Sequence, residues 1–253
     1  MTDAIHRFIA LNVRSGGAPR AAALADLVVQ SHADVAVLSE AYSTGHDQVL
    51  LNALRSRGYV HQATAHSDTT NTADATAIVS RLPISSVRQP ITHGPNRQRV
   101  LEAQIGGVLV VGAYFPLEKP KVRFWREEFL PYAATRLDQD AILLGDWNSG
   151  SHFRDEQGKT LDGAAEFEQL SAAGWIDAWR AARDDNSREY TWSSSQGNGF
   201  RLDHAFLAPS LASRLVEARY LQGAREDPIV NARGETTTAT DHAALIVDLR
   251  VTR

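Results

Sequence analysis

Polar side chains follow or precede several of the short apolar runs in this sequence, at the points where those runs end or begin. These residues are Asn12, Glu40, Asp146 with Asn148, Asp203 with His204, and Asp241 with His242. Burying a carboxylate beside an apolar strand is costly unless the charge is paired or bound to a metal. A single Asp or Asn at a strand end is usually a turn former. Because the placement recurs, we expect these groups to converge at one edge of the sheets.

The sequence contains no cysteine, which limits the chemistry of such a cluster. A thiolate nucleophile, a disulfide framework, a Cys-ligated zinc ion and an iron–sulfur cluster are all excluded. A metal would have to be held by oxygen and nitrogen ligands, which favours Mg²⁺, Mn²⁺ or Ca²⁺ over soft metals.

The formal net charge is −4, which argues weakly against a protein that coats nucleic acid electrostatically. The basic residues are unevenly divided, however: of 26 Lys and Arg, only positions 119, 121 and 159 are Lys, which leaves 23 Arg. Arginine presents a planar fork that suits phosphate oxygens. A GC-rich genome would produce the same excess through its codons.

Length and composition predict one globular domain over residues 1–253. Hydrophobic residues make up 43% and charged residues 22%, and no linker-like segment divides the chain. The polar N-terminus, Met1 to His6, lacks the apolar stretch of a signal peptide. The longest apolar run, Val108 to Phe115, is too short to span a membrane. We therefore expect a soluble, cytoplasmic protein.

Short apolar runs alternate with helical patterns along the whole chain, which predicts a mixed α/β fold with about ten strands and four or five helices. Strands are expected over residues 5–13, 33–39, 60–65, 75–80, 99–105, 108–114, 141–144, 202–207 and 243–251. Helices are expected from Pro19, over 47–57, over 122–137 with Pro131 kinking or dividing it, and over 164–173. Gly106-Gly107 predicts a hairpin.

The strand-end residues lie in short motifs whose order along the chain resembles the endonuclease/exonuclease/phosphatase superfamily. The motifs are Leu11-Asn12-Val13, Ser39-Glu40, Gly145-Asp146-Trp147-Asn148, Arg201-Leu202-Asp203-His204 and Thr240-Asp241-His242. Each is weak alone, whereas all of them in register are strong. The branch that the chain resembles is the exonuclease III type of apurinic/apyrimidinic endonuclease. This resemblance implies a four-layer α/β sandwich, with two packed mixed β-sheets flanked by helices and the site at one end.

The resemblance also implies a divalent metal, Mg²⁺ or Mn²⁺. Glu40 matches the main ligand, with Asn12 close to it and Asp241 as a further ligand, direct or through water. Mg²⁺ prefers oxygen ligands and retains water molecules that a substrate phosphate can replace. Its expected part is to offset phosphate charge and stabilise the leaving oxygen.

The same resemblance assigns catalytic parts to five residues, which are Asp146, Asn148, His242, Asp203 and Tyr114. Asp146 would orient or deprotonate the attacking water, which requires a raised pKa. Asn148 would hold the water or a phosphate oxygen. Asp203 would fix the tautomer of His242, which would donate to the phosphoryl oxygen. The hydroxyl of Tyr114 would contact the scissile phosphate, and His204 is expected to be structural.

The substrate is less sharply defined, because the superfamily includes hydrolases of several phosphate esters. Trp192, Phe200 and Leu202 match positions that form an apolar pocket for an extruded abasic sugar in the nuclease branch, although aromatic residues also pack in ordinary cores. Arg14 stands where relatives carry Asn or Asp, and is expected near a phosphate of the substrate. Tyr42 stands where they carry Lys.

We therefore expect a Mg²⁺- or Mn²⁺-dependent DNA nuclease, acting on duplex DNA and leaving 3′-hydroxyl ends, with neither a membrane nor an obligate protein partner. A phosphodiesterase or phosphatase acting on a small or lipid-linked phosphate is the second hypothesis. A non-catalytic nucleic-acid-binding module is the third, although such a module has no need for so many costly carboxylates.

Overall fold

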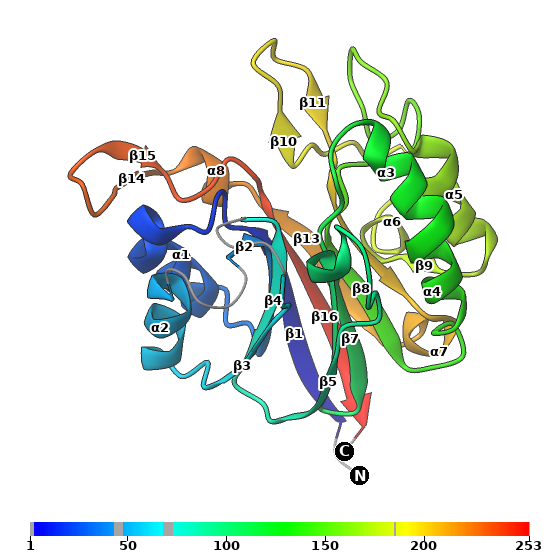
Figure 1. Ribbon diagram of the computed structural model, residues 1–253, viewed down its shortest axis with the longest axis horizontal. Helices are drawn as coiled ribbons and strands as arrows, with labels where there is room; N and C mark the ends of the chain where they lie inside the picture. The colour runs from blue at the N-terminus through cyan, green and yellow to red at the C-terminus, as the bar shows by residue number, and fades with distance from the viewer. Residues whose placement is uncertain (1–2, 43–47, 68–72, 185, 253) are drawn as a thin grey trace.

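The computed structural model describes residues 3–42, 48–67, 73–184 and 186–252. Its centre is formed by two six-stranded sheets that pack face to face (Figure 1). The first sheet has the order β13 (Leu215–Leu221), β16 (Ala244–Thr252), β1 (Asp3–Asn12), β2 (Val35–Ala41), β4 (Ala75–Ser80) and β3 (His61–Thr64). The second has the order β5 (Ile84–Arg88), β6 (Val100–Ile105), β7 (Val108–Ala113), β8 (Ala141–Asp146), β12 (Asp203–Leu207) and β9 (Ile176–Asp177).

Helices cover the outer face of each sheet and complete four layers (Figure 1). On the first sheet lie α1 (Ala21–Gln30) and α2 (Val49–Ser56), whose buried leucines pack against its outer face. On the second lie α3 (Lys119–Arg123), the π-helix η3 (Phe124–Phe129), α4 (Leu130–Ala134) and α5 (Ala164–Ala172). A further apolar core fills the space between the sheets. The predicted α/β sandwich is confirmed.

The remaining elements are short. They are the 3-10 helices η1 (Ala18–Arg20) and η2 (Arg97–Arg99), the helices α6 (Ala178–Ala181), α7 (Pro209–Ala212) and α8 (Gly223–Glu226), and the strands β10 (Trp192–Ser193), β11 (Gly199–Phe200), β14 (Pro228–Val230) and β15 (Thr236–Thr238). Two-stranded hairpins are formed by β10 with β11 and by β14 with β15. None of the helices in the described part of the chain is long and apolar enough to cross a membrane.

The expected strands and helices are present, and the hairpin at Gly106-Gly107 is confirmed. Ile105 pairs with Val108, and the two glycines have φ of 56° and 85°, as a two-residue hairpin loop of this type requires. The helix expected from Asp47 is observed from Val49, and Asp47 itself lies outside the described residues.

The helix expected over 122–137 consists of α3, η3 and α4 in direct succession. Pro131 does not end it, because the helical stretch continues through the proline into α4. The wider π turn immediately precedes that position, and such turns are rare in helices.

Candidate active site

The expected site residues meet at one edge of the two sheets. Asn12 ends β1, and Glu40 is near the end of the parallel strand β2. Asp146 ends β8 and pairs with Asp203 at the start of β12. The two sheets are joined here by a hydrogen bond of 3.2 Å from the backbone N–H of Asp146 to the Ser39 hydroxyl. Strand direction and register therefore bring together residues that are far apart in the sequence.

The amide of Asn12 links the two principal carboxylates. Its Nδ2 donates to Glu40 Oε1 at 3.1 Å and to Asp146 Oδ2 at 2.9 Å, while its Oδ1 accepts from the backbone N–H of Arg14 at 2.8 Å. The Tyr114 hydroxyl donates to Glu40 Oε1 at 3.3 Å. Asn12 thus presents its nitrogen, and not its oxygen, to the carboxylates.

Glu40 is held by the backbone of the neighbouring loop. The N–H of Ser15 donates to Glu40 Oε2 at 2.7 Å. The residue has a φ of 58°, a left-handed conformation that non-glycine residues adopt at a cost. Such backbone persists where the surrounding contacts define it and is concentrated at functional sites.

The turn after β8 is also tightly constrained. Asn148 has a φ of 48°, its N–H donates to Asp146 Oδ1 at 3.0 Å, and its Nδ2 donates to the carbonyl of Phe115 at 3.0 Å. Gly145, just before Asp146, has a φ of 146°, and a Cβ there would lie 2.1 Å from the carbonyl oxygen of Ala113. Only glycine fits that position, which aims Asp146 into the site.

Asp203 and His242 form a buried pair beside Asp146. His242 Nδ1 lies 2.9 Å from Asp203 Oδ2, and the two residues are 5% and 0% exposed. This contact leaves Nε2 of the imidazole for another partner. The second oxygen of Asp203 is buried and has no hydrogen-bond partner among the described residues.

Burial and neighbouring charges shift the pKa values of Asp146 and His242. Burial, together with the nearby charge of Asp203, raises the pKa of Asp146 to about 7, although His242 and hydrogen bonds oppose the rise. Burial lowers the pKa of His242, but Asp203 and Asp146 outweigh it and raise this pKa to about 10. The cluster therefore combines a carboxyl poised near neutrality with an imidazolium.

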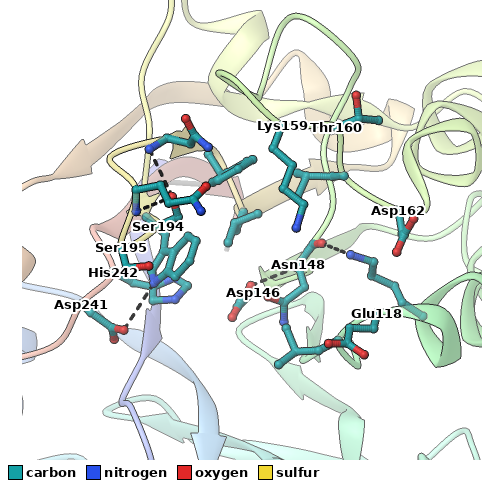
Figure 2. Close-up of a pocket in the computed structure, with 18 of the residues that line it drawn as sticks. Glu118, Asp146, Asn148, Lys159, Thr160, Asp162, Ser194, Ser195, Asp241 and His242 are labelled. Atoms are coloured by element: carbon teal, nitrogen blue, oxygen red, sulfur yellow. Dashed lines mark hydrogen bonds between the residues drawn. The ribbon is translucent and has the colours of Figure 1, made fainter.

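Asp146 and His242 line a cavity of about 600 Å³, to which Tyr114, Asn148 and Asp241 also contribute. Figure 2 shows Asp241 and His242 on one side of it, with Asp146 and Asn148 across from them. Phe200 and Leu202 form a buried part of its wall, and the Trp192 ring lies 5.9 Å from that of Phe200.

Arg14 lies at the edge of this group. Its side chain is 47% exposed, and its Nε is 4.0 Å from Asp241 Oδ1. Trp192 Nε1 donates to the other oxygen of Asp241 at 3.4 Å. The structure thus brings the expected metal, catalytic and substrate residues into one neighbourhood.

The oxygen-rich side of the cluster fits a hard divalent cation. Glu40 makes no salt bridge with any residue that the structure describes, and it lines the cavity. Asp146, Asp203 and His242 also bring one ligand atom each within 4.8 Å of one another. The last two are already hydrogen-bonded to each other, so a cation between them would have to replace that bond. Glu40 and Asp241 are the better oxygen donors.

Three polar features of the site were not expected from the sequence. Lys121 is only 4% exposed, and its Nζ donates to the carbonyl oxygen of Asn148. Lys159 lines the cavity from the loop before α5. Ser39 provides the link between the sheets. His204, which is expected to be structural, is buried, and its Nε2 lies 2.7 Å from the carbonyl of Ser149.

A buried ion-pair network lies behind the site. Arg201 is 1% exposed, and its guanidinium donates to Asp155 Oδ1 at 2.7 Å and to Asp177 Oδ2 at 2.6 Å. Burial raises the pKa of Asp155, but Arg201 outweighs it and holds this pKa below its usual range. The network fixes the base of the loop that carries Lys159.

We expect Arg201→Met to lower the free energy of unfolding by about 3 kcal/mol, because two buried carboxylates would lose their main partner. Urea unfolding at neutral pH measures this change. Asp26→Asn, which breaks an exposed pair with Arg57 of 2.8 Å, is the matched control and should leave stability nearly unchanged. Equal effects of the two substitutions would show that the buried network does not stabilise the fold.

Comparison with known families confirms the resemblance. Residues 9–242 match the model of the endonuclease/exonuclease/phosphatase family. The chain belongs to this family. The family hydrolyses phosphoester bonds, and the chain is an enzyme of that class. A search of curated proteins finds no match.

Solved structures of similar fold include DNA-acting enzymes. An AP endonuclease from Archaeoglobus fulgidus superposes with a TM-score of 0.77 at 19% identity, covering 96% of this chain and 98% of its own. A 3′-5′ exonuclease from Neisseria meningitidis gives 0.77 at 22% identity, with 96% and 99% covered. An AP endonuclease from Leishmania major gives 0.74 at 17% identity, with 98% and 88% covered. At these identities the similarity establishes the fold.

Proposed function

We propose that this enzyme hydrolyses phosphodiester bonds in duplex DNA and leaves 3′-hydroxyl ends, with Mg²⁺ or Mn²⁺ as its cofactor. The observation that carries the proposal is the meeting of Asp146, Asp203 and His242, whose ligand atoms lie within 4.8 Å of one another, at a cavity with an aromatic wall. The raised pKa of Asp146 agrees with its use as a base. The solved neighbours of the same fold include AP endonucleases and a 3′-5′ exonuclease, which favours DNA as the substrate.

In this proposal Glu40 and Asp241 hold the cation, and Asn12 orients the carboxylates through its amide N–H groups. When bound, the cation would offset phosphate charge and stabilise the departing O3′. Tyr114 keeps its proton, because burial and the nearby Glu40 raise the pKa of its hydroxyl. Tyr114 therefore remains a hydrogen-bond donor at neutral pH.

The chain's own residues then move protons at defined atoms. Asp146 accepts a proton from a water molecule, whose oxygen attacks phosphorus in line as the bond to O3′ breaks. His242 donates a hydrogen bond from its Nε2–H to a non-bridging phosphoryl oxygen, where negative charge develops. The departing O3′ takes up a proton from solvent water and becomes the 3′-hydroxyl. Asp203 holds the imidazole in the required orientation. Asn148 has one amide N–H and its Oδ1 left over for the water or the phosphate.

The pocket side chains come from the β10–β11 hairpin and from the short link between β11 and β12. Trp192, Phe200 and Leu202 provide apolar surface for a sugar, and Arg14 provides a cation at the rim. The cavity volume of about 600 Å³ is within the range of pockets that enclose whole small molecules, so it does not by itself select an abasic sugar. Both abasic and base-bearing ends therefore belong in the test.

A substrate panel with Mg²⁺ or Mn²⁺ tests this proposal. We expect turnover of abasic duplex or 3′-recessed duplex at rates well above those for single strands and small phosphodiesters, and complete loss of turnover in EDTA. Activity that survives EDTA would exclude the metal-dependent mechanism. If the enzyme turned over small phosphodiesters alone, these compounds and not DNA would be its substrates. If it turned over no substrate at all, the proposal would be refuted.

A further inference from the structure

Lysine is rare in this chain, and most of it lies at the active-site cavity. Of the 26 Lys and Arg only three are Lys, and two of these, Lys121 and Lys159, line the active-site cavity. Lys119 is the third; it is exposed at the start of α3 and is not part of the cavity wall. An ammonium group is a compact point charge that suits a single phosphate oxygen.

The ammonium group of Lys121 has partners within the protein. Its Nζ donates to the carbonyl of Asn148, and Asp162 and Asp146 lie close enough to favour its charged form against burial. Because this lysine supports the strained turn at Asn148 and faces a carboxylate, it is a positioning residue.

Lys159 has no such partner. Its side chain forms no hydrogen bond or ion pair with any residue that the structure describes, and Figure 2 shows it reaching into the cavity above Asn148. Glu118 lies on the other side of Asn148 in the same view. Of the two lysines that line the cavity in the described part of the chain, Lys159 is therefore the one left available to a ligand.

The loop that carries Lys159 is braced, so the lysine has a defined place. Asp155 anchors the loop to the buried Arg201. Further along, the N–H of Gln157 donates to the carbonyl of Gly199 in β11 at 2.9 Å, and the N–H of Leu161 donates to Glu156 Oε2 at 2.7 Å. These contacts on both sides of Lys159 distinguish it from a lysine on an unconstrained loop.

We propose that Lys159 binds the backbone phosphate next to the scissile one, so that the enzyme selects substrates with two consecutive charged phosphates. The inference rests on the proposed DNA hydrolysis, in which His242 takes the scissile phosphate from another side of the cavity. An ester with a single phosphate has no second phosphate for Lys159 to bind. Lys159 therefore favours nucleic-acid chains over such esters.

The test uses a DNA hairpin whose 3′-terminal phosphodiester is the scissile bond, and the same hairpin with a neutral methylphosphonate at the neighbouring linkage. For the wild-type enzyme we expect the neutral linkage to raise KM about tenfold with little change in kcat, as loss of one charge-assisted hydrogen bond predicts. Lys159→Gln should raise KM for the charged hairpin by the same factor and make the enzyme indifferent to the methylphosphonate. Lys119→Gln should behave as wild type. A Lys159→Gln enzyme that still discriminates fully would overturn the proposal.

A binding measurement separates this proposal from the proposed activity. Reductive ¹³C-methylation labels only three lysines and the N-terminal amine, and Lys→Arg variants assign their NMR signals. We expect the Lys159 signal to shift with the charged hairpin and to shift less with the methylphosphonate form. If the wild-type enzyme cleaves neither hairpin, the proposed function fails, while the Lys159 signal still decides the phosphate contact. A signal that does not move at saturating charged hairpin would refute the contact.

Discussion

Asp146→Asn is expected to lower kcat for DNA hydrolysis by about 10³-fold, within the range that general-base catalysis contributes. Asparagine has nearly the same shape as aspartate but cannot accept the proton of the attacking water. The raised pKa of Asp146, about 7, also predicts how the rate depends on pH. Protonation should inactivate the wild-type enzyme as the pH falls below 7, so its rate should drop about tenfold per pH unit there. The variant's residual rate should lack this slope. Steady-state kinetics between pH 5 and 9 measure both effects.

Unfolding measurements provide the control for this variant. Both oxygens of Asp146 accept hydrogen bonds, one from Asn12 and one from the backbone N–H of Asn148. In Asp146→Asn the new side-chain NH₂ group would face one of these donors, and that hydrogen bond would be lost. Removing a buried carboxylate with a raised pKa works in the opposite direction, because its ionisation destabilises the folded state above the ordinary pKa of 3.8. We therefore expect a folded variant with a changed urea midpoint. Retained turnover at more than a tenth of the wild-type rate would remove Asp146 from the role of base.

The convergence of the site was predictable because it depends on strand ends, and strand ends are marked by a change from apolar to polar residues. Asn12 and Glu40 meet because β1 and β2 are parallel, and Asp146 meets Asp203 because β8 and β12 pair antiparallel with their ends aligned. The apolar runs that form the central strands are buried on both faces, so their pattern is continuous and easy to recognise.

The elements that the sequence did not indicate lie at edges or are very short. Strand β5 is almost wholly exposed, and β13 is only partly buried, so neither carries a strong apolar pattern. The hairpins β10–β11 and β14–β15 have strands of two and three residues, which are too short for any periodicity. Edge strands are commonly short and polar for this reason.

The supporting residues of the site could not be recognised from their own neighbourhoods. Lys121 lies in a helix with charged neighbours and resembles a surface residue, yet packing places it in the cavity wall. Arg201 lies within a recognisable motif, but its partners Asp155 and Asp177 are 46 and 24 residues away. Such pairings depend on how the layers pack, and one sequence without relatives does not encode them locally.

His242→Ala is expected to lower kcat by about 10²- to 10³-fold, with a smaller effect on KM, because the imidazolium would act on charge that develops in the transition state. The substitution also leaves Asp203 buried without its partner, so part of any loss could arise from destabilisation. Urea unfolding of His242→Ala measures that part. A loss confined to KM would assign His242 to ground-state binding and contradict the proposed role.

Asp203→Asn tests the pair without removing the imidazole. Asp203 is the main cause of the raised pKa of His242, about 10, so neutralising it should move the alkaline limit of activity to lower pH. The same shift has a consequence for stability. A histidine whose folded pKa is raised stabilises the protein fully below its ordinary pKa of 6.5, and that stabilisation is lost as the pH rises toward 10. The wild-type free energy of unfolding should therefore decline between pH 6.5 and 10, and Asp203→Asn should flatten this decline. An unchanged alkaline limit and an unchanged decline would together show that Asp203 does not hold His242 in its charged form.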